Sequence, residues 1–157
     1  MLHIAIYCYI VFPYRYILLY TNIFFLIILY IATYCYILIH TATYCFIKLF
    51  SAIYSYTLLH TAIYCYILLN STTYSYILLH NATYCYIQIY SPILIYCYIL
   101  LYTATYCYIL LNTTIFCFIL LYTVIYCDIL LHSALYYYIL LYTATYCYVM
   151  VHTAFYK

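Results

Sequence analysis

Charged residues are almost missing from this chain. Lys and Arg together occur three times and Asp and Glu once, so charged residues make up 3% of the 157 residues, against about 25% in an ordinary soluble domain. Charged side chains normally form the polar surface of such a domain. The composition therefore predicts a chain that enters a membrane or aggregates in water. The four charged residues are Arg15, Lys48, Asp128 and Lys157.

The missing residue types also exclude several functions. Glutamate is absent and Asp128 is the one carboxylate side chain, which excludes acid–base catalysis by paired carboxylates. Glycine is absent, which excludes P-loops, dinucleotide-binding fingerprints and nucleophile elbows. Three scattered basic residues cannot supply the clustered phosphate contacts of a nucleic-acid binder. We therefore expect no enzyme activity, no cofactor, no small-molecule substrate and no nucleic-acid partner.

Cysteine and histidine are present, but their spacing follows an internal repeat. Most of the ten cysteines lie multiples of ten residues apart, as Cys45 and Cys65 do. Structural zinc sites usually contain closely spaced pairs, C-x₂₋₄-C, and the sequence contains none. A Cys–His pair such as Cys35 and His40 recurs with the unit, and no acid is available to orient the His. The sequence thus predicts no catalytic, cofactor-binding or metal-ligating residue.

The dominant feature of the chain is a ten-residue repeat with the consensus T-A-T-Y-C-Y-I-L-L, followed by His, Tyr or Asn. Hydrophobic residues make up 75% of the chain, and Tyr occurs 32 times. The repeat organises the chain into four parts. They are degenerate hydrophobic repeats at 1–30, a first phase at 31–90, a phase shift at 91–97 where two extra residues enter, and a second phase at 98–157.

Translation of a shorter DNA repeat explains this unit. The peptide TATYCYILLH can be encoded by ACT GCT ACA TAC TGC TAC ATA CTG CTA CAT, which is ACTGCTACAT written three times. Deviations such as Ser55, Gln88 and Asp128 each need one base change. All three forward frames encode the same cyclic peptide without a stop codon, so insertions shift the phase harmlessly. The leading interpretation is a translated decanucleotide tandem repeat, a minisatellite-type open reading frame, with no evolved biochemical function.

The period favours strands over helices. Ten residues of α-helix advance about 1000°, which is about 80° short of three turns, so no fixed apolar face forms. In a strand an even period keeps each residue on one face, with Thr, Cys, Ile and Leu on one side and Ala, Tyr, Leu and His on the other. The polar His-Thr junctions are the predicted bends. We predict an all-β fold, a solenoid with Tyr and Cys ladders or a meander, that is prone to cross-β aggregation.

Helical membrane spans are the alternative. Residues 17–39, ILLYTNIFFLIILYIATYCYILI, are long enough to cross a bilayer, with Thr21, Asn22 and Thr33 as the clear polar exceptions. This alternative describes a small multipass membrane protein whose partner is the lipid bilayer. The expected location is a membrane if the chain is expressed, and otherwise an insoluble aggregate formed by self-association.

A third possibility comes from a resemblance. The segments Thr41-Ala42-Thr43, Thr103-Ala104-Thr105 and Thr143-Ala144-Thr145 resemble the T-x-T rows of insect antifreeze solenoids, and the ten-residue period with a Tyr row is similar to the midge type. Those solenoids use Gly or small residues and two Cys per coil, whereas this chain has no Gly and one Cys per unit. A ten-residue coil also cannot enclose Tyr, Ile and Leu together. The resemblance implies a structural or ice-binding β-solenoid.

Overall fold

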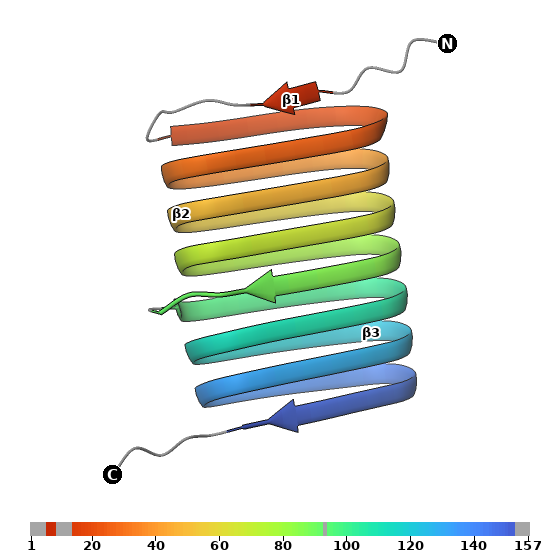
Figure 1. Cartoon of the computed structure of the whole chain (residues 1–157). Helices are drawn as coiled ribbons and strands as arrows, with labels where there is room; N and C mark the ends of the chain where they lie inside the picture. Colours follow the sequence, from red (N-terminus) through yellow and green to blue (C-terminus); the bar gives the residue numbers. More distant parts are fainter. Residues whose placement is uncertain (1–5, 9–13, 93, 153–157) are drawn as a thin grey trace.

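The chain forms a column of stacked β-coils. The computed structural model describes residues 6–8, 14–92 and 94–152, with the backbone alone for residues 6–8, 14, 15, 21 and 22. Three strands, β1 (Ile6–Cys8), β2 (Tyr14–Ile89) and β3 (Leu94–Val151), form one parallel sheet in that order. Figure 1 shows that β2 and β3 wind continuously around a common axis. The prediction of an all-β solenoid is confirmed.

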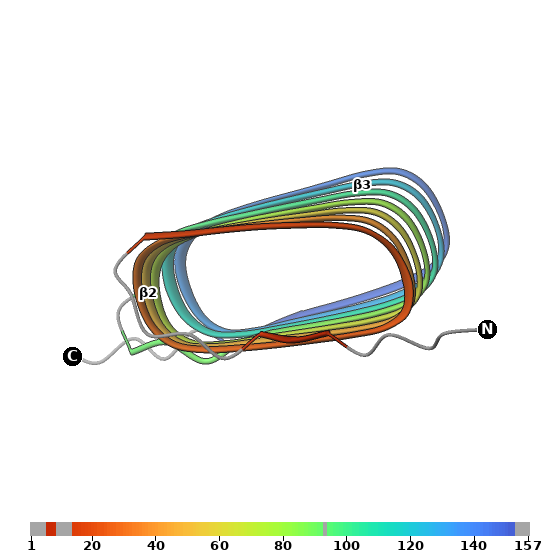
Figure 2. The ribbon, with the colours of Figure 1, turned by 90° about the horizontal axis from the view of Figure 1, so that it is seen from above.

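One coil of the solenoid takes two ten-residue units. Tyr16 and Tyr36, which are twenty residues apart, stack with ring centroids 4.8 Å apart. This distance equals the spacing of neighbouring strands in a sheet, about 4.7–4.9 Å, so these tyrosines are equivalents in successive coils. Seen along the axis, each coil is a flattened loop with two long sides and two rounded ends (Figure 2). Two units therefore share one interior, which removes the crowding expected of a ten-residue coil.

Each unit supplies one long side and one rounded end. In unit 103–112 the side chains of Cys107, Ile109 and Leu111 are buried, which confirms that these three share one face and shows that this face is the inner one. Around the rounded end, residues 102 and 103 face outward in succession, as do residues 105 and 106, while Ala104 between them is buried. The bend is thus divided between two corners, of which the sequence indicated only the first.

The predicted placement of Thr and Ala was wrong. Simple alternation puts Thr inside and Ala outside, whereas Thr103 and Thr105 lie outside and Ala104 lies inside. The two outward neighbours at each corner shift the alternation by one residue, and the second corner shifts it back. The inward position of a rounded end holds a small side chain, which is Ala in most coils and Thr72, Thr114 or Val124 in others. No residue in the described part of the chain has a positive φ, so these corners form without the conformations that glycine provides.

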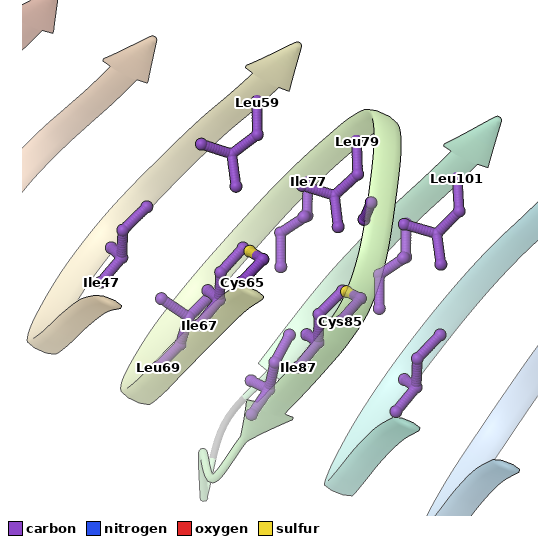
Figure 3. Close-up of a cluster of buried hydrophobic side chains, with 14 of the residues drawn as sticks. Ile47, Leu59, Cys65, Ile67, Leu69, Ile77, Leu79, Cys85, Ile87 and Leu101 are labelled. Atoms are coloured by element: carbon purple, nitrogen blue, oxygen red, sulfur yellow. The ribbon is translucent and has the colours of Figure 1, made fainter. Parts of the chain in front are cut away.

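The core lies between the two long sides. Ile67 and Leu69 project inward from one side, and Ile77 and Leu79 project inward from the other, all four with at most 1% of their surface exposed. Figure 3 shows these side chains together with the buried thiols of Cys65 and Cys85. Burying an Ile or Leu side chain stabilises a fold by about 1.5–3 kcal/mol. Because the rows repeat in every coil, this core extends along the whole axis.

Two extra residues enter at a rounded end. β2 ends at Ile89 and β3 begins at Leu94, and across this break Tyr74 pairs with Tyr96, twenty-two residues later. The chain protrudes from the loop at this end, in green in Figure 2. The Oγ of Ser91 donates a hydrogen bond of 2.8 Å to the carbonyl oxygen of Thr72. The long sides beyond the insertion then regain their inward and outward pattern.

The predicted transmembrane helix is wrong. Residues 17–39 lie within β2, where Ile27, Leu29 and Ile37 face the interior and are at most 1% exposed. The hydrophobic residues of this segment form part of the core between the two long sides of the solenoid. Over the ranges that the structure describes, no helix has the length and apolar character needed to cross a bilayer.

The rounded ends supply a direct test of this fold. We expect Ala104→Leu to lower the free energy of unfolding by about 1–3 kcal/mol, because Leu is larger than any side chain buried at this position in the described coils, where Val124 is the largest. The matched control, Thr105→Leu, points outward and is expected to change stability by about 0.5 kcal/mol or less. Urea unfolding followed by circular dichroism measures both. If Thr105→Leu destabilised the chain more than Ala104→Leu, Thr105 would be the inward residue and the described fold would be contradicted.

Candidate functional surfaces

The two long sides carry the aromatic residues. We call one side the Asp128 face and the other the Ser55 face. The Asp128 face comprises residues 24–29, 44–49, 64–69, 84–89, 106–111, 126–131 and 146–151, and the Ser55 face comprises residues 16–19, 34–39, 54–59, 74–79, 96–101, 116–121 and 136–141. Each face presents the two outward tyrosines of its units, at the fourth and sixth positions. Because coils stack in register, equal positions form straight columns parallel to the axis.

On the Asp128 face these columns are two aromatic ladders. The first ladder has ring centroids 4.8–5.0 Å apart and planes within 7° of parallel, and the second has centroids 4.6–5.1 Å apart. Each stacked pair contributes about 0.5–1.5 kcal/mol beyond area burial. The first ladder consists of Phe24, Tyr44, Tyr64, Tyr84, Tyr106, Tyr126 and Tyr146, and the second of Phe46, Tyr66, Tyr86 and Tyr108.

A groove of about 810 Å³ runs between these ladders. Leu26 lines one end of it, and Asp128, which replaces the consensus Tyr, lines the other. The Ser55 face has two smaller grooves of about 370 and 390 Å³, and no charged residue lines either of them. Burial, followed by the charges of stacked neighbours, raises the pKa of Tyr86 above its usual value. Its phenol is therefore a neutral hydroxyl at physiological pH.

Under the groove lies a buried row of thiols. The hydrogen bond with Cys45, together with burial, raises the pKa of the Cys65 thiol well above its usual value. Burial and the neighbouring Cys127 raise the pKa of Cys147, in the last coil, to about 11. Reactive cysteines are thiolates with lowered pKa values. The thiols of Cys65 and Cys147 have raised pKa values, so they stay protonated and are not suited to act as nucleophiles. The row consists of the buried Cys45, Cys65, Cys85, Cys107 and Cys127 and continues to Cys147, which is exposed in the last coil, and none of the six forms a disulfide.

The structure does not bring the Cys35–His40 pair together. Cys35 points into the core, whereas His40 lies outside the coil and is exposed. His40 instead stacks on His60 with ring centroids 4.9 Å apart, and its Nδ1 lies 3.0 Å from the Oγ1 of Thr41. Among the side chains that the structure describes, no three His, Cys, Asp or Glu residues are grouped to hold a metal ion.

One rounded end carries two outward rows rich in threonine, and we call it the Thr end. It includes all three segments that resemble antifreeze repeats. The opposite end is interrupted by the insertion at Ser91 and Pro92, whereas no insertion interrupts the Thr end. The first row consists of Thr41, Thr61, Asn81, Thr103, Thr123 and Thr143, and the second of Thr43, Ile63, Thr83, Thr105, Ile125 and Thr145.

Some substitutions in the repeat point outward from the solenoid, and others are buried in its core. Lys48, Gln88 and Asp128 all point outward, and the Nζ of Lys48 lies 4.6 Å from the ring centroid of Phe50. Polar substitutions that point inward destabilise the fold, because a buried hydroxyl without a hydrogen-bond partner lowers its stability by about 1–3 kcal/mol. Four such hydroxyls in the core have no partner, those of Ser55, Thr57, Thr72 and Ser75. The sequence showed these changes but not their burial, which depends on the corners.

The last coil is an open edge. Tyr146 in this coil is 61% exposed, whereas its equivalent Tyr106 in an interior coil is 42% exposed. Leu141 packs on the core but is only partly buried, whereas its equivalent Leu121 is 1% exposed. Within the described residues nothing covers the far side of this coil. Its backbone donors and acceptors on that side are free to pair with another strand.

Comparison with known proteins identifies no relative. No family model, no curated protein and no solved structure matches the chain. The grooves, the thiol row, the Thr end and the open edge are therefore the physical basis for a functional proposal.

Proposed function

We propose that the chain is a structural β-solenoid that associates end to end into fibres and carries out no chemical reaction. The observation that supports this proposal is the open, apolar edge of the last coil, 133–152, where Leu141 is only partly covered. Solenoid proteins need terminal repeats with a polar outer face to remain soluble. A long, flat and hydrophobic edge strand is a site of association.

The geometry of association follows from the parallel stacking. The last coil of one copy continues the inward rows of the interior coils through Ile139, Leu141 and Val151, so the open side of the first coil of another copy can pair with it in register. Such a head-to-tail contact does not close on itself and generates an open filament. The first coil is open along the side that contains Tyr16 and Tyr20, which are each 70% exposed, whereas β1 pairs with its other side at Phe25–Ile27. The assembled chain belongs in the insoluble fraction.

Charge placed at the open edge is expected to prevent assembly. In Leu141→Lys the ammonium group reaches solvent while the edge is open, but a second copy would bury it without a partner. The matched control is Leu140→Lys, in which the lysine points outward and leaves the edge free. We expect fibres with a meridional reflection near 4.7–4.8 Å from the parent chain and the control, and none from Leu141→Lys.

Sedimentation and fibre diffraction distinguish the outcomes. If Leu141→Lys assembles as readily as Leu140→Lys, association does not use the open edge and the proposal is wrong. If the chain floats with lipid vesicles and forms no fibres, the lipid bilayer is its partner and the membrane location is correct.

We also propose that the repeat arose by translation of a decanucleotide DNA repeat, without selection for a biochemical activity. The unpaired hydroxyls of Ser55, Thr57 and Ser75 support this origin, because they weaken the core and serve no described contact. Selection for a stable core would be expected to remove them. The polar residues that point outward are compatible with either origin.

The coding DNA tests this origin. We expect ACTGCTACAT to persist at silent codon positions as faithfully as at the others, because a DNA repeat is copied without regard to reading frame. Resequencing the locus measures this directly. Silent positions that have diverged while the TATYCYILL peptide is retained would show selection on the protein and refute the origin.

Ice binding at the Thr end is a second candidate function. It is favoured by the outward placement of threonines on both sides of a buried alanine, as at Thr103, Ala104 and Thr105. Successive T-x-T pairs follow one another along the axis at the strand spacing of about 4.7–4.9 Å. Asn81, Ile63 and Ile125 interrupt the two rows.

Thermal hysteresis of soluble chain tests this candidate. We expect Thr105→Lys to abolish most of the hysteresis, because a long charged side chain projects from the centre of the Thr end. The matched control Thr73→Lys lies at the equivalent position of the opposite rounded end and is expected to have no effect. Equal loss in both variants, or no hysteresis in the parent chain, would remove ice binding.

A further inference from the structure

The groove on the Asp128 face has a floor without side chains. Cys45, Cys65, Cys85 and Cys107 occupy the position between its two ladders, and all four point into the core with 3–5% of their surface exposed. The floor is therefore the strand backbone itself, which is flat and already paired within the sheet. A bound molecule would meet aromatic groups on both sides and backbone beneath it.

The width of the groove selects a flat molecule. The two ladders are carried by residues that lie two positions apart along each strand. At a rise of about 3.3–3.4 Å per residue, the backbone positions that carry them are about 6.6–6.8 Å apart. Carbon atoms in contact are about 3.5–4.0 Å apart. One layer of atoms fits between the ladders, and a branched or folded molecule does not. Aromatic rings pair favourably with other aromatic rings in edge-to-face or offset arrangements, so walls made of rings favour an aromatic ligand.

The length of the groove selects an elongated molecule. The second ladder runs from Phe46 to Tyr108 and is followed by Asp128 one coil later. Four steps at the strand spacing make about 19 Å. The planes of consecutive rings in this stretch lie within 7° of parallel, so the walls are straight. Two or three linked aromatic ring systems, aligned with the solenoid axis, match this length.

The end of the groove selects a positive charge. Asp128 is the one acidic residue of the chain, and it takes the place that aromatic residues hold at Tyr86 and Tyr108. It is exposed on the outer surface. Aspartate at this place interrupts the second ladder and leaves a carboxylate at the open end of an apolar groove. A cation there gains a partner, while the rest of the ligand gains aromatic contacts.

We propose that this groove binds a flat, elongated aromatic cation, with its long axis parallel to the solenoid axis and its charged end at Asp128. The ligand lies within one chain, so binding goes beyond the structural role proposed above and does not require end-to-end assembly. The smaller grooves of the Ser55 face lack a carboxylate and are not expected to distinguish a cation from its neutral counterpart.

The test uses two probes that differ in charge. One is thioflavin T, a flat benzothiazolium cation, and the other is the uncharged benzothiazole that lacks its ring N-methyl group. Equilibrium dialysis on the full-length chain measures the affinity and the number of molecules bound per chain. We expect one cation-selective site per chain and about a fivefold preference for the cation, the size of a surface ion pair.

Charge variants test the end of the groove. Asp128→Asn is expected to abolish the preference for the cation while leaving the neutral probe unaffected. Lys48→Met is the control for position, since it removes a charge from the same face outside the groove. It changes the net charge in the direction opposite to Asp128→Asn, and the preference for the cation should persist without loss. A preference that survives Asp128→Asn would overturn the proposal.

Wall variants test the location. Tyr86→Ala removes a central ring of the second ladder and is expected to weaken cation binding about tenfold, the size of a lost stacking contact. Tyr76→Ala, at the equivalent position of the Ser55 face, should leave the cation-selective site intact. Equal losses of cation binding in both variants would overturn the proposal. In Leu141→Lys, loss of fibres with retained binding would separate this site from assembly.

Discussion

The structure depends on the in-register stacking of identical coils at the spacing of a β-sheet. Once a coil closes after twenty residues, every hydrogen bond, every aromatic stack and every core row repeats along the axis. Tyr16 on Tyr36 and His40 on His60 are consequences of this one constraint. No separate contact between distant parts of the chain is needed. This explains how a sequence of such low complexity forms a defined interior.

The same stacking also explains how the chain forms corners without glycine. Each rounded end divides its bend between two pairs of outward residues, and a buried alanine such as Ala104 lies between them. The backbone therefore remains in extended conformations that Thr and Tyr adopt readily. The outer surface of the solenoid is apolar as a result. Outward tyrosines and leucines take the place of charged residues, so solubility depends on what covers the ladders and edges.

Much of the fold could be predicted from the period alone. An even repeat rich in Tyr, Ile and Thr identifies strands, and it placed Cys, Ile and Leu together on one face. The inward Ala and outward Thr could not be predicted, because their placement depends on a second corner that carries no glycine or proline signal. The coil of two units was also missed, since the space inside a loop is a property of paired sides. The groove at Asp128 required that pairing as well, whereas the lone carboxylate itself was evident in the sequence.

The coil of two units makes the solenoid sensitive to parity. Gain or loss of a pair of units lengthens or shortens the column and leaves every ladder where it was. Gain or loss of a single unit turns all later coils by half a revolution, so that the histidines, the threonines and Asp128 exchange sides with their counterparts. The insertion at Ser91 and Pro92 avoids this exchange because its two residues are accommodated at a rounded end. Two chains that differ by a single unit would thus share one fold but present these residues on opposite sides of the later coils.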